Sequence, residues 1–276
     1  MKTMAFGTGV FAIYSMFAWA TTALGQESKQ DGDSTALKQR RLEIMRKRIN
    51  SLQVIGADGN ACEFSKSPLL RYSDQERSVV DACLWSIGKS GRPCGIVVLE
   101  VYRGTSIQYE FTAAAELPKS VQGDSWRWEP EDSDFTWVRI PDQASPEDAR
   151  VARRTQVPEI ATKFRAKEEF RGRTYDLELM RQPILWYADK AKGVLDAAAF
   201  VFAHGTNAEI LMFIEAQTSD AGKTKWVAGF SRMGSAALNV TFAEKEFWSR
   251  PTYYGNPKRT YFYRLEQLTE DEQGAF

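Results

Sequence analysis

One stretch of the chain is present twice, and its two copies are separated by a fixed offset of 115 residues. The first copy, PLLRYSDQERSVVDACLWSIGKSGRPCGIVVLE, runs from Pro68 to Glu100, and the second, PILWYADKAKGVLDAAAFVFAHGTNAEILMFIE, runs from Pro183 to Glu215. They align without a gap, and a proline, a leucine, a tyrosine, a valine, an alanine, two aspartates and a glutamate are identical at matching positions. Such self-similarity predicts an internal duplication, so the chain should fold as two related units.

Each copy predicts a β-hairpin. Two short runs of β-type residues flank a glycine-containing turn, at 81–87 and 95–102 in the first copy and at 196–202 and 209–216 in the second. Apolar residues occupy both faces of these runs, which is typical of the central strands of a sheet. The repeat therefore predicts two hairpins that lie inside sheets.

A carboxylate falls on an otherwise apolar face of each hairpin, at Glu100 and Glu215. An unpaired buried charge is costly, so each glutamate should have a basic partner or lie at a sheet edge. For Glu215 the expected partner is Arg232, because the run 226–233 should be the antiparallel neighbour of the strand that carries Glu215. The alternative is that both side chains point to solvent at strand ends and contribute little to stability.

A helical pattern precedes each hairpin, and a longer strand follows it. Apolar residues recur at spacings of three and four over 35–54, and a second helical segment at 146–170 should be split or kinked by Pro158. We predict an α+β fold with an internal duplication of a helix followed by a mainly antiparallel β-meander, either as two lobes or with both sheets fused. The expected units are 35–145 and 146–262, followed by a polar tail at 263–276.

The N-terminal residues 1–25 read as a secretory signal peptide, with a basic start, an apolar run and a small-residue exit. Cleavage after Ala20 and cleavage after Gly25 both fit, and the alternative is an uncleaved membrane anchor. The polar residues 26–34 are expected to form a disordered lead-in. We therefore predict export to the periplasm or the exterior, with no membrane span left after cleavage.

The charge balance and the cysteines limit the possible partners. The chain has 36 basic and 36 acidic residues, so nucleic acid is not an expected partner. An exported chain with three cysteines could form one disulfide, and a bridge should involve Cys62, because Cys94 should face Ile87 and not Cys83 across the hairpin. The alternative is three unpaired thiols. We predict no metal site, because CxxC spacing is absent and His204, in the hairpin turn, is the only histidine.

No catalytic constellation is recognisable in the sequence, and no catalytic residue is predicted. The carboxylates repeated in both copies are explained by the shared backbone. Trp126, Trp128 and Trp137 could stack on sugar rings, with core packing as the alternative. We therefore expect a non-catalytic exported binding or structural module without a cofactor; its ligand is unknown, and a carbohydrate and another envelope protein are the candidate partners. The alternative is a hydrolase that acts on carbohydrate or envelope polymers through carboxylates and the tryptophan-rich loop.

The second copy and the strand after it resemble a known protein family. LMRQPILWYADKAKGVLDAAAFVFAHGTNAEILMFIEA and KWVAGFSRM are similar to LxPxPLxRY, DGALFAFVxGTDPExLLLIEA and WxYALARM, which are typical of uncharacterised exported proteins of planctomycete bacteria. The first copy is similar to the N-terminal half of that family, and the match covers most of the chain after about Leu37. Ala197, His204 and Cys94 depart from its pattern. The resemblance implies export and a duplicated fold, and it implies no activity, cofactor or catalytic residue.

Overall fold

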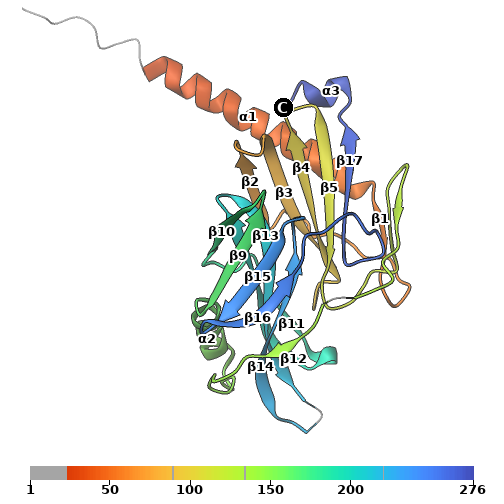
Figure 1. The fold of residues 1–276 in the computed structure, drawn as a ribbon. Helices are drawn as coiled ribbons and strands as arrows, with labels where there is room; N and C mark the ends of the chain where they lie inside the picture. The colour runs from red at the N-terminus through yellow and green to blue at the C-terminus, as the bar shows by residue number, and fades with distance from the viewer. Residues whose placement is uncertain (1–23, 89, 134, 220) are drawn as a thin grey trace, which may run out of the picture. The chain divides into compact units, whose positions relative to one another are not determined.

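The computed structural model describes residues 24–88, 90–133, 135–219 and 221–276 (Figure 1). The chain forms two units, one that ends at Gln39 and one that runs from Arg40 to Phe276, and all the described strands belong to the second unit. The expected signal peptide lies almost entirely outside the described residues. Among the described helices, none is both long enough and apolar enough to cross a membrane.

Three antiparallel sheets make up most of the second unit. The first sheet has the order β17-β5-β4-β3-β2, with β2 at Leu70–Asp74, β3 at Val79–Ile87, β4 at Gly95–Tyr102, β5 at Ser106–Ala113 and β17 at Tyr261–Gln267. The second sheet has the order β16-β15-β9-β10-β12-β13-β14-β8, with β11 paired to β12; its strands are β8 Val138–Arg139, β9 Phe164–Phe170, β10 Arg173–Leu179, β11 Leu185–Asp189, β12 Val194–His204, β13 Asn207–Thr218, β14 Thr224–Arg232, β15 Ala237–Phe242 and β16 Lys245–Arg250. A small third sheet joins β1 Gln53–Ile55, β6 Ser120–Gln122 and β7 Arg127–Trp128. The predicted α+β class is confirmed in a mostly β form.

The helices differ from the predicted ones at their ends. Helix α1 spans Leu24–Asn50, so residues 26–34, expected to be a disordered lead-in, are helical. Helix α2 spans Arg150–Ala161 with Pro158 in its last turn, and the predicted helical segment 146–170 is wrong at both ends. The last seven residues of the predicted segment, 164–170, form strand β9. Buried and exposed side chains alternate along them, which is the period of a strand and not of a helix.

Both predicted hairpins are confirmed, and their registers agree at the same offset of 115 residues. Ala82 lies opposite Glu100, and Ala197 lies opposite Glu215. The flanking strand pairs β2–β3 and β11–β12 also share one register, including a shift after the tyrosine of each strand. Glu100 and Glu215 therefore hold equivalent positions on equivalent strands.

Each half of the chain ends in a strand that pairs with the sheet of the other half. Strand β8 belongs to the expected first unit, 35–145, but pairs with β14 of the second sheet. Strand β17 comes at the end of the chain and pairs with β5 of the first sheet. The residues of the predicted polar tail, 263–276, complete β17 and form α3, Glu270–Gln273. Arg48 anchors this segment through ion pairs to Glu266 at 3.0 Å and Glu272 at 2.6 Å.

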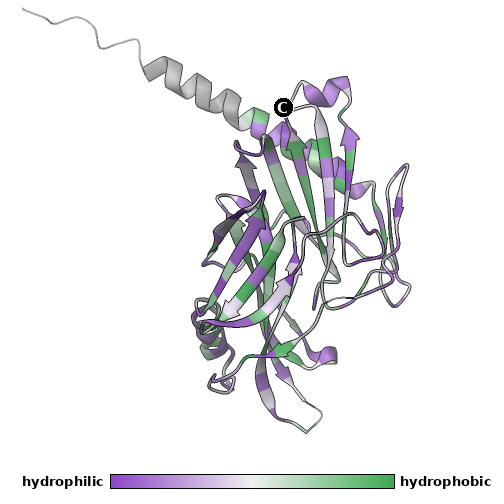
Figure 2. Cartoon of the chain, viewed as in Figure 1, coloured by the Kyte–Doolittle hydropathy of each residue, from purple (hydrophilic) through white to green (hydrophobic). Residues whose placement is uncertain are grey.

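The first two sheets stack face to face, so they are neither two separate lobes nor one fused sheet. Leu84 and Val98 of the first sheet pack in one cluster with Ala199, Leu211 and Phe213 of the second. The outer face of the first sheet packs against the part of α1 from Met45, and the outer face of the second packs against α2. Figure 2 shows hydrophobic residues along β3 and β4, whereas β9 and β10 are mostly hydrophilic.

Two cysteines lie in a position to form a disulfide. The Sγ atoms of Cys62 and Cys94 are 3.3 Å apart, and an S–S bond of about 2.05 Å needs only a small approach. Burial, and then the neighbouring Cys62, raise the pKa of Cys94 to about 12, so oxidation near neutral pH should be slow.

We expect diamide at alkaline pH to join Cys62 to Cys94 and to raise the free energy of unfolding by about 2–4 kcal/mol. Peptide mapping under non-reducing conditions identifies the bridge, and urea unfolding with and without reductant measures the gain. The Cys94→Ser variant should show no such gain. A bridge that contains the buried Cys83 would contradict this expectation.

Candidate functional site

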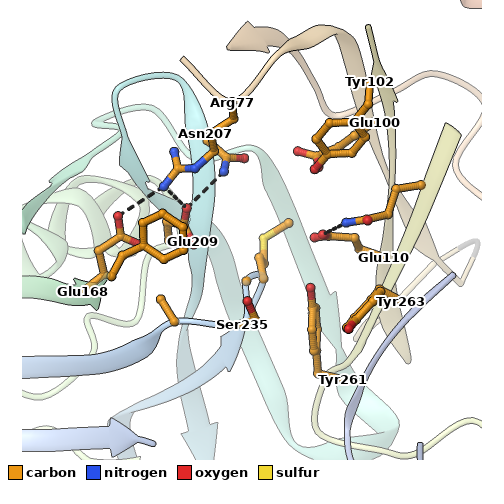
Figure 3. A pocket seen from close by; sticks show the side chains of 15 residues that line it. Arg77, Glu100, Tyr102, Glu110, Glu168, Asn207, Glu209, Ser235, Tyr261 and Tyr263 are labelled. Atoms are coloured by element: carbon orange, nitrogen blue, oxygen red, sulfur yellow. Dashed lines mark hydrogen bonds and ion pairs between the residues drawn. The ribbon is translucent and has the colours of Figure 1, made fainter. Parts of the chain in front are cut away.

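A cavity of about 220 Å³ lies between the first and second sheets and is lined by four glutamates (Figure 3). Glu100 and Glu110 come from β4 and β5, and Glu168 and Glu209 come from β9 and β13. Arg77, in the loop between β2 and β3, is the one basic side chain among the described residues that line the cavity. The aromatic lining on the side of the first sheet includes Tyr102, Tyr261 and Tyr263.

The antiparallel pairing of β4 and β5 places Glu100 and Glu110 on the same face. Glu100 lies opposite Gln108, and Glu110 lies two residues further along β5, opposite Val98. The two glutamates are therefore diagonal neighbours, with Cα atoms roughly 7–8 Å apart. Their carboxyl groups face the second sheet, from a surface that is otherwise apolar at Ile96 and Val98.

A β-bulge directs Glu209 into the cavity. Phe202 pairs with Ile210 and Ala203 pairs with Ala208, so Glu209 is the extra residue of β13. A Cβ atom on Gly234 would clash with Oε2 of Glu209, so no larger residue fits at 234 without displacing the carboxylate. The bulge and the glycine together accommodate a buried carboxylate that a regular strand would not place there.

Arg77 is shared among three carboxylates. Its guanidinium lies 3.1 Å from Asp74, 3.2 Å from Glu168 and 3.0 Å from Glu209. Oε1 of Glu168 also contacts Nδ1 of His204, at the end of β12. Oε2 of Glu168 is buried and has no hydrogen-bond partner among the described residues. One cation therefore compensates only part of this acidic group.

Burial raises the pKa of three cavity glutamates. Glu209 has a pKa of about 8, raised first by burial and then by the charge of Glu168. Burial, followed by the charge of Glu100, raises the pKa of Glu110 well above its usual value. Burial also raises the pKa of Glu100, although hydrogen bonds from Tyr102 and Tyr72 oppose the shift. The raised pKa values favour the uncharged form of these carboxyls, which lowers the cost of burying them beside a single cation.

Glu100 and Glu215, equivalent in register, have different partners. Tyr72 donates to Glu100 at 2.6 Å, and Tyr102 donates to its other oxygen. At Glu215, Tyr187 donates at 2.7 Å, and Arg92 donates through Nε at 2.8 Å and through Nη2 at 2.5 Å. The first-sheet hairpin thus supplies a bidentate arginine to the second sheet, and Glu100 has only hydroxyl donors.

The predicted pair of Glu215 with Arg232 is wrong. Arg232 lies opposite Ile210, whereas Val227 lies opposite Glu215, so five residues of β14 separate the two positions. This separation is about 16 Å along a strand. Arg232 instead donates to backbone carbonyl oxygens at the β14–β15 turn, including that of Gly234 at 2.9 Å. The expected cation does reach Glu215, but it comes from the other sheet.

The three tryptophans proposed to bind a ligand do not form one surface. Trp128 is 1% exposed and packs on Phe262 with ring centroids 5.8 Å apart, so it cannot present a face to a sugar. Trp126 is half-buried, and its indole N–H donates to Glu266 at 2.8 Å. Trp137 lies against Arg92, 4.9 Å from guanidinium carbon to ring centroid. The structure brings Trp126 and Trp128 together in one core and places Trp137 in another.

Most of the cavity residues were not singled out from the sequence. The repeat contained one signal, because the charge differs between its two copies at hairpin positions that include Arg92, which corresponds to Asn207, and Cys94, which corresponds to Glu209. No group of three or more His, Cys, Asp or Glu side chains among the described residues is arranged to hold a metal ion.

Comparison with known proteins finds no matching family model, no matching curated protein and no matching solved structure, so the cavity itself is the basis for a functional proposal.

Proposed function

We propose that this protein is an exported, non-catalytic binding module whose ligand site is the cavity between the two stacked sheets. The observation that carries the proposal is the convergence of four glutamates, three tyrosines and one arginine on one small space. Buried polar groups normally have hydrogen-bond partners, but Oε2 of Glu168 has none among the described residues. A polar ligand would supply the missing partner. Export follows from the pattern of the N-terminal segment.

The dimensions of the cavity favour a small ligand. Its volume of about 220 Å³ is below the range of roughly 300–1,000 Å³ that is typical of sites for drug-sized molecules. The lining side chains come mostly from paired strands, which hold polar groups in defined positions. A small molecule, or the terminal group of a larger one, would therefore be bound with a fixed orientation.

We also propose that the two stacked sheets are copies of one duplicated unit. The shared registers of the two hairpins and of the strands beside them support this origin. So does the exchange of edge strands, in which β8 extends the second sheet and β17 extends the first. Under this proposal the duplication produced two related polar positions between the sheets, at Glu100 and at Glu215.

A screen of small molecules tests the binding proposal. We expect at least one compound from a set of amines, amino acids, sugars, nucleosides and carboxylates to raise the melting temperature of the purified protein. At a ligand concentration of about 100 Kd, the stabilisation should be about 2.7 kcal/mol. Ser235 is exposed and lines the cavity, so Ser235→Trp should obstruct the site and abolish the shift.

Ser235→Ala is the matched control, because it leaves the cavity open and should respond as the wild type does. If no compound class shifts the melting temperature, or if every shift persists in Ser235→Trp, the cavity is not the ligand site.

A second candidate function is the hydrolysis of carbohydrate or envelope polymers. The observation that favours it is Glu209, whose pKa of about 8 would let it donate a proton near neutral pH, with Glu168 in the same cavity. The small cavity and the separated tryptophans favour binding over polymer cleavage. A separate assay of glycan hydrolysis distinguishes the two, because turnover of any glycan that is lost in Glu209→Gln would replace the binding proposal.

A further inference from the structure

The cavity has a counterpart between the same two sheets that is filled by the protein's own side chains. An offset of 115 residues relates Tyr72 and Glu100 to Tyr187 and Glu215. In both positions the tyrosine hydroxyl donates to the glutamate, at 2.6 Å in the first and 2.7 Å in the second. The two positions therefore begin from the same pair of side chains in the same register.

The counterpart contains a guanidinium, that of Arg92, at a position where the cavity has no basic residue. Arg92 donates to both oxygens of Glu215, and 115 residues after Arg92 the chain has Asn207, which lines the cavity. The turn of each hairpin donates a hydrogen bond to a strand of the other sheet. The N–H of Arg92 donates to Asp189 on β11, and the hydroxyl of Thr206 donates to a backbone carbonyl on β2. Asn207 thus replaces the arginine in the sequence, and its amide donates to Glu209 at 3.0 Å.

The cavity also contains a carboxylate that the counterpart lacks. Strand β5 matches β14, because Gln108 lies opposite Glu100 and Val227 lies opposite Glu215. Two residues further along each strand, Glu110 corresponds to Gly229. A Cβ atom on Gly229 would collide with the ring of Phe135, which fills that space. At corresponding positions the cavity therefore has one cation fewer, with Asn207 for Arg92, and two carboxylates more, because Glu209 also stands where the first copy has Cys94.

We infer that the cavity binds a small organic cation with a guanidinium or ammonium group, which occupies beside Glu100 and Glu110 the position that Arg92 occupies beside Glu215. This inference rests on the proposed function and specifies its ligand class. Oε2 of Glu168, buried and without a partner among the described residues, is a further acceptor for the cation. The tyrosines of the lining supply aromatic rings, as Trp137 does for Arg92 at 4.9 Å.

Isothermal titration calorimetry with methylguanidinium and agmatine tests the inference, with N-methylurea as the neutral analogue of similar shape. We expect one equivalent of each cation to bind, and N-methylurea to bind about 10- to 100-fold more weakly, because charge-assisted hydrogen bonds are lost. Glu110→Gln keeps the shape of the side chain and should weaken cation binding by a similar factor. Glu244→Gln, at an exposed turn that does not line the cavity, is the control and should bind as the wild type does.

Asn207→Arg is the converse variant. The introduced guanidinium should take the position beside Glu100, as Arg92 does beside Glu215, and should abolish binding of both cations. Glu110→Gln keeps the test valid if Asn207→Arg does not fold.

The outcomes separate this inference from the proposed function. If the cations bind no more tightly than N-methylurea, or if Glu110→Gln leaves their affinity unchanged, the cation inference is wrong. If neutral or anionic molecules bind instead and Ser235→Trp blocks them, the cation inference fails while the proposed function stands. If no molecule of any charge binds, both fail.

Discussion

Replacing Arg92 by methionine is expected to lower the free energy of unfolding by about 3–5 kcal/mol, the usual cost of removing one partner of a buried ion pair. Glu215 is 0% exposed, and both of its oxygens accept hydrogen bonds from Arg92. The variant would leave this carboxylate with only Tyr187 and Gln217 as donors, at 2.7 and 2.8 Å. Urea unfolding of the two proteins under the same conditions measures the difference.

Two further variants show whether the cost arises from the uncompensated charge. Adding Glu215→Gln to Arg92→Met removes both charges, so the double variant should recover part of the lost stability. Arg127→Met breaks an exposed ion pair, in which the Arg127 and Glu129 side chains are 52% and 58% exposed, and should cost less than about 1 kcal/mol. An Arg92→Met cost as small as that of Arg127→Met would show that the buried pair contributes little.

The stability of the wild type relative to Glu209→Gln is expected to fall as the pH rises from 5 to 9. The pKa of Glu209 is about 8 in the folded protein, against 4.5 as its ordinary value. Between these two values the folded state binds more protons than the unfolded state, so the free energy of unfolding decreases with rising pH. Integrated over that interval, the change is about 5 kcal/mol, at about 1.4 kcal/mol for each pH unit.

The groups that face Glu209 explain the direction of this shift. Glu168 on β9, Glu100 on β4 and Asp74 on β2 raise its pKa through their charges, and Arg77 lowers it, with burial as the largest cause. Urea unfolding of both proteins at several pH values measures the difference, and Glu244→Gln shows how much of any trend arises elsewhere. A Glu209→Gln difference that stays constant between pH 5 and 9 would mean that Glu209 is ionised throughout.

The repeat, read by itself, determined both hairpins and their common register. Strand periodicity and glycine turns act over a few residues, so 81–87 with 95–102 and 196–202 with 209–216 were paired correctly. The same local argument placed Glu100 and Glu215 on apolar faces. It also required a partner for each buried carboxylate, because burying an uncompensated charge is costly. This cost does not indicate which residue the partner will be.

Only the tertiary structure decided which residues became those partners. The prediction of Arg232 assumed that the neighbouring strand would supply the cation, but Arg92 reaches Glu215 across the stacked sheets. The exchange of β8 and β17, and the convergence of Glu110, Glu168 and Glu209 on one cavity, depend likewise on how the sheets are stacked. Stacking brings together residues that are far apart in the chain. The sheets stack through apolar contacts, and many different arrangements of the two sheets would bury apolar side chains equally well. No pattern within a single strand therefore specifies that Glu215 receives an arginine and Glu100 a cavity.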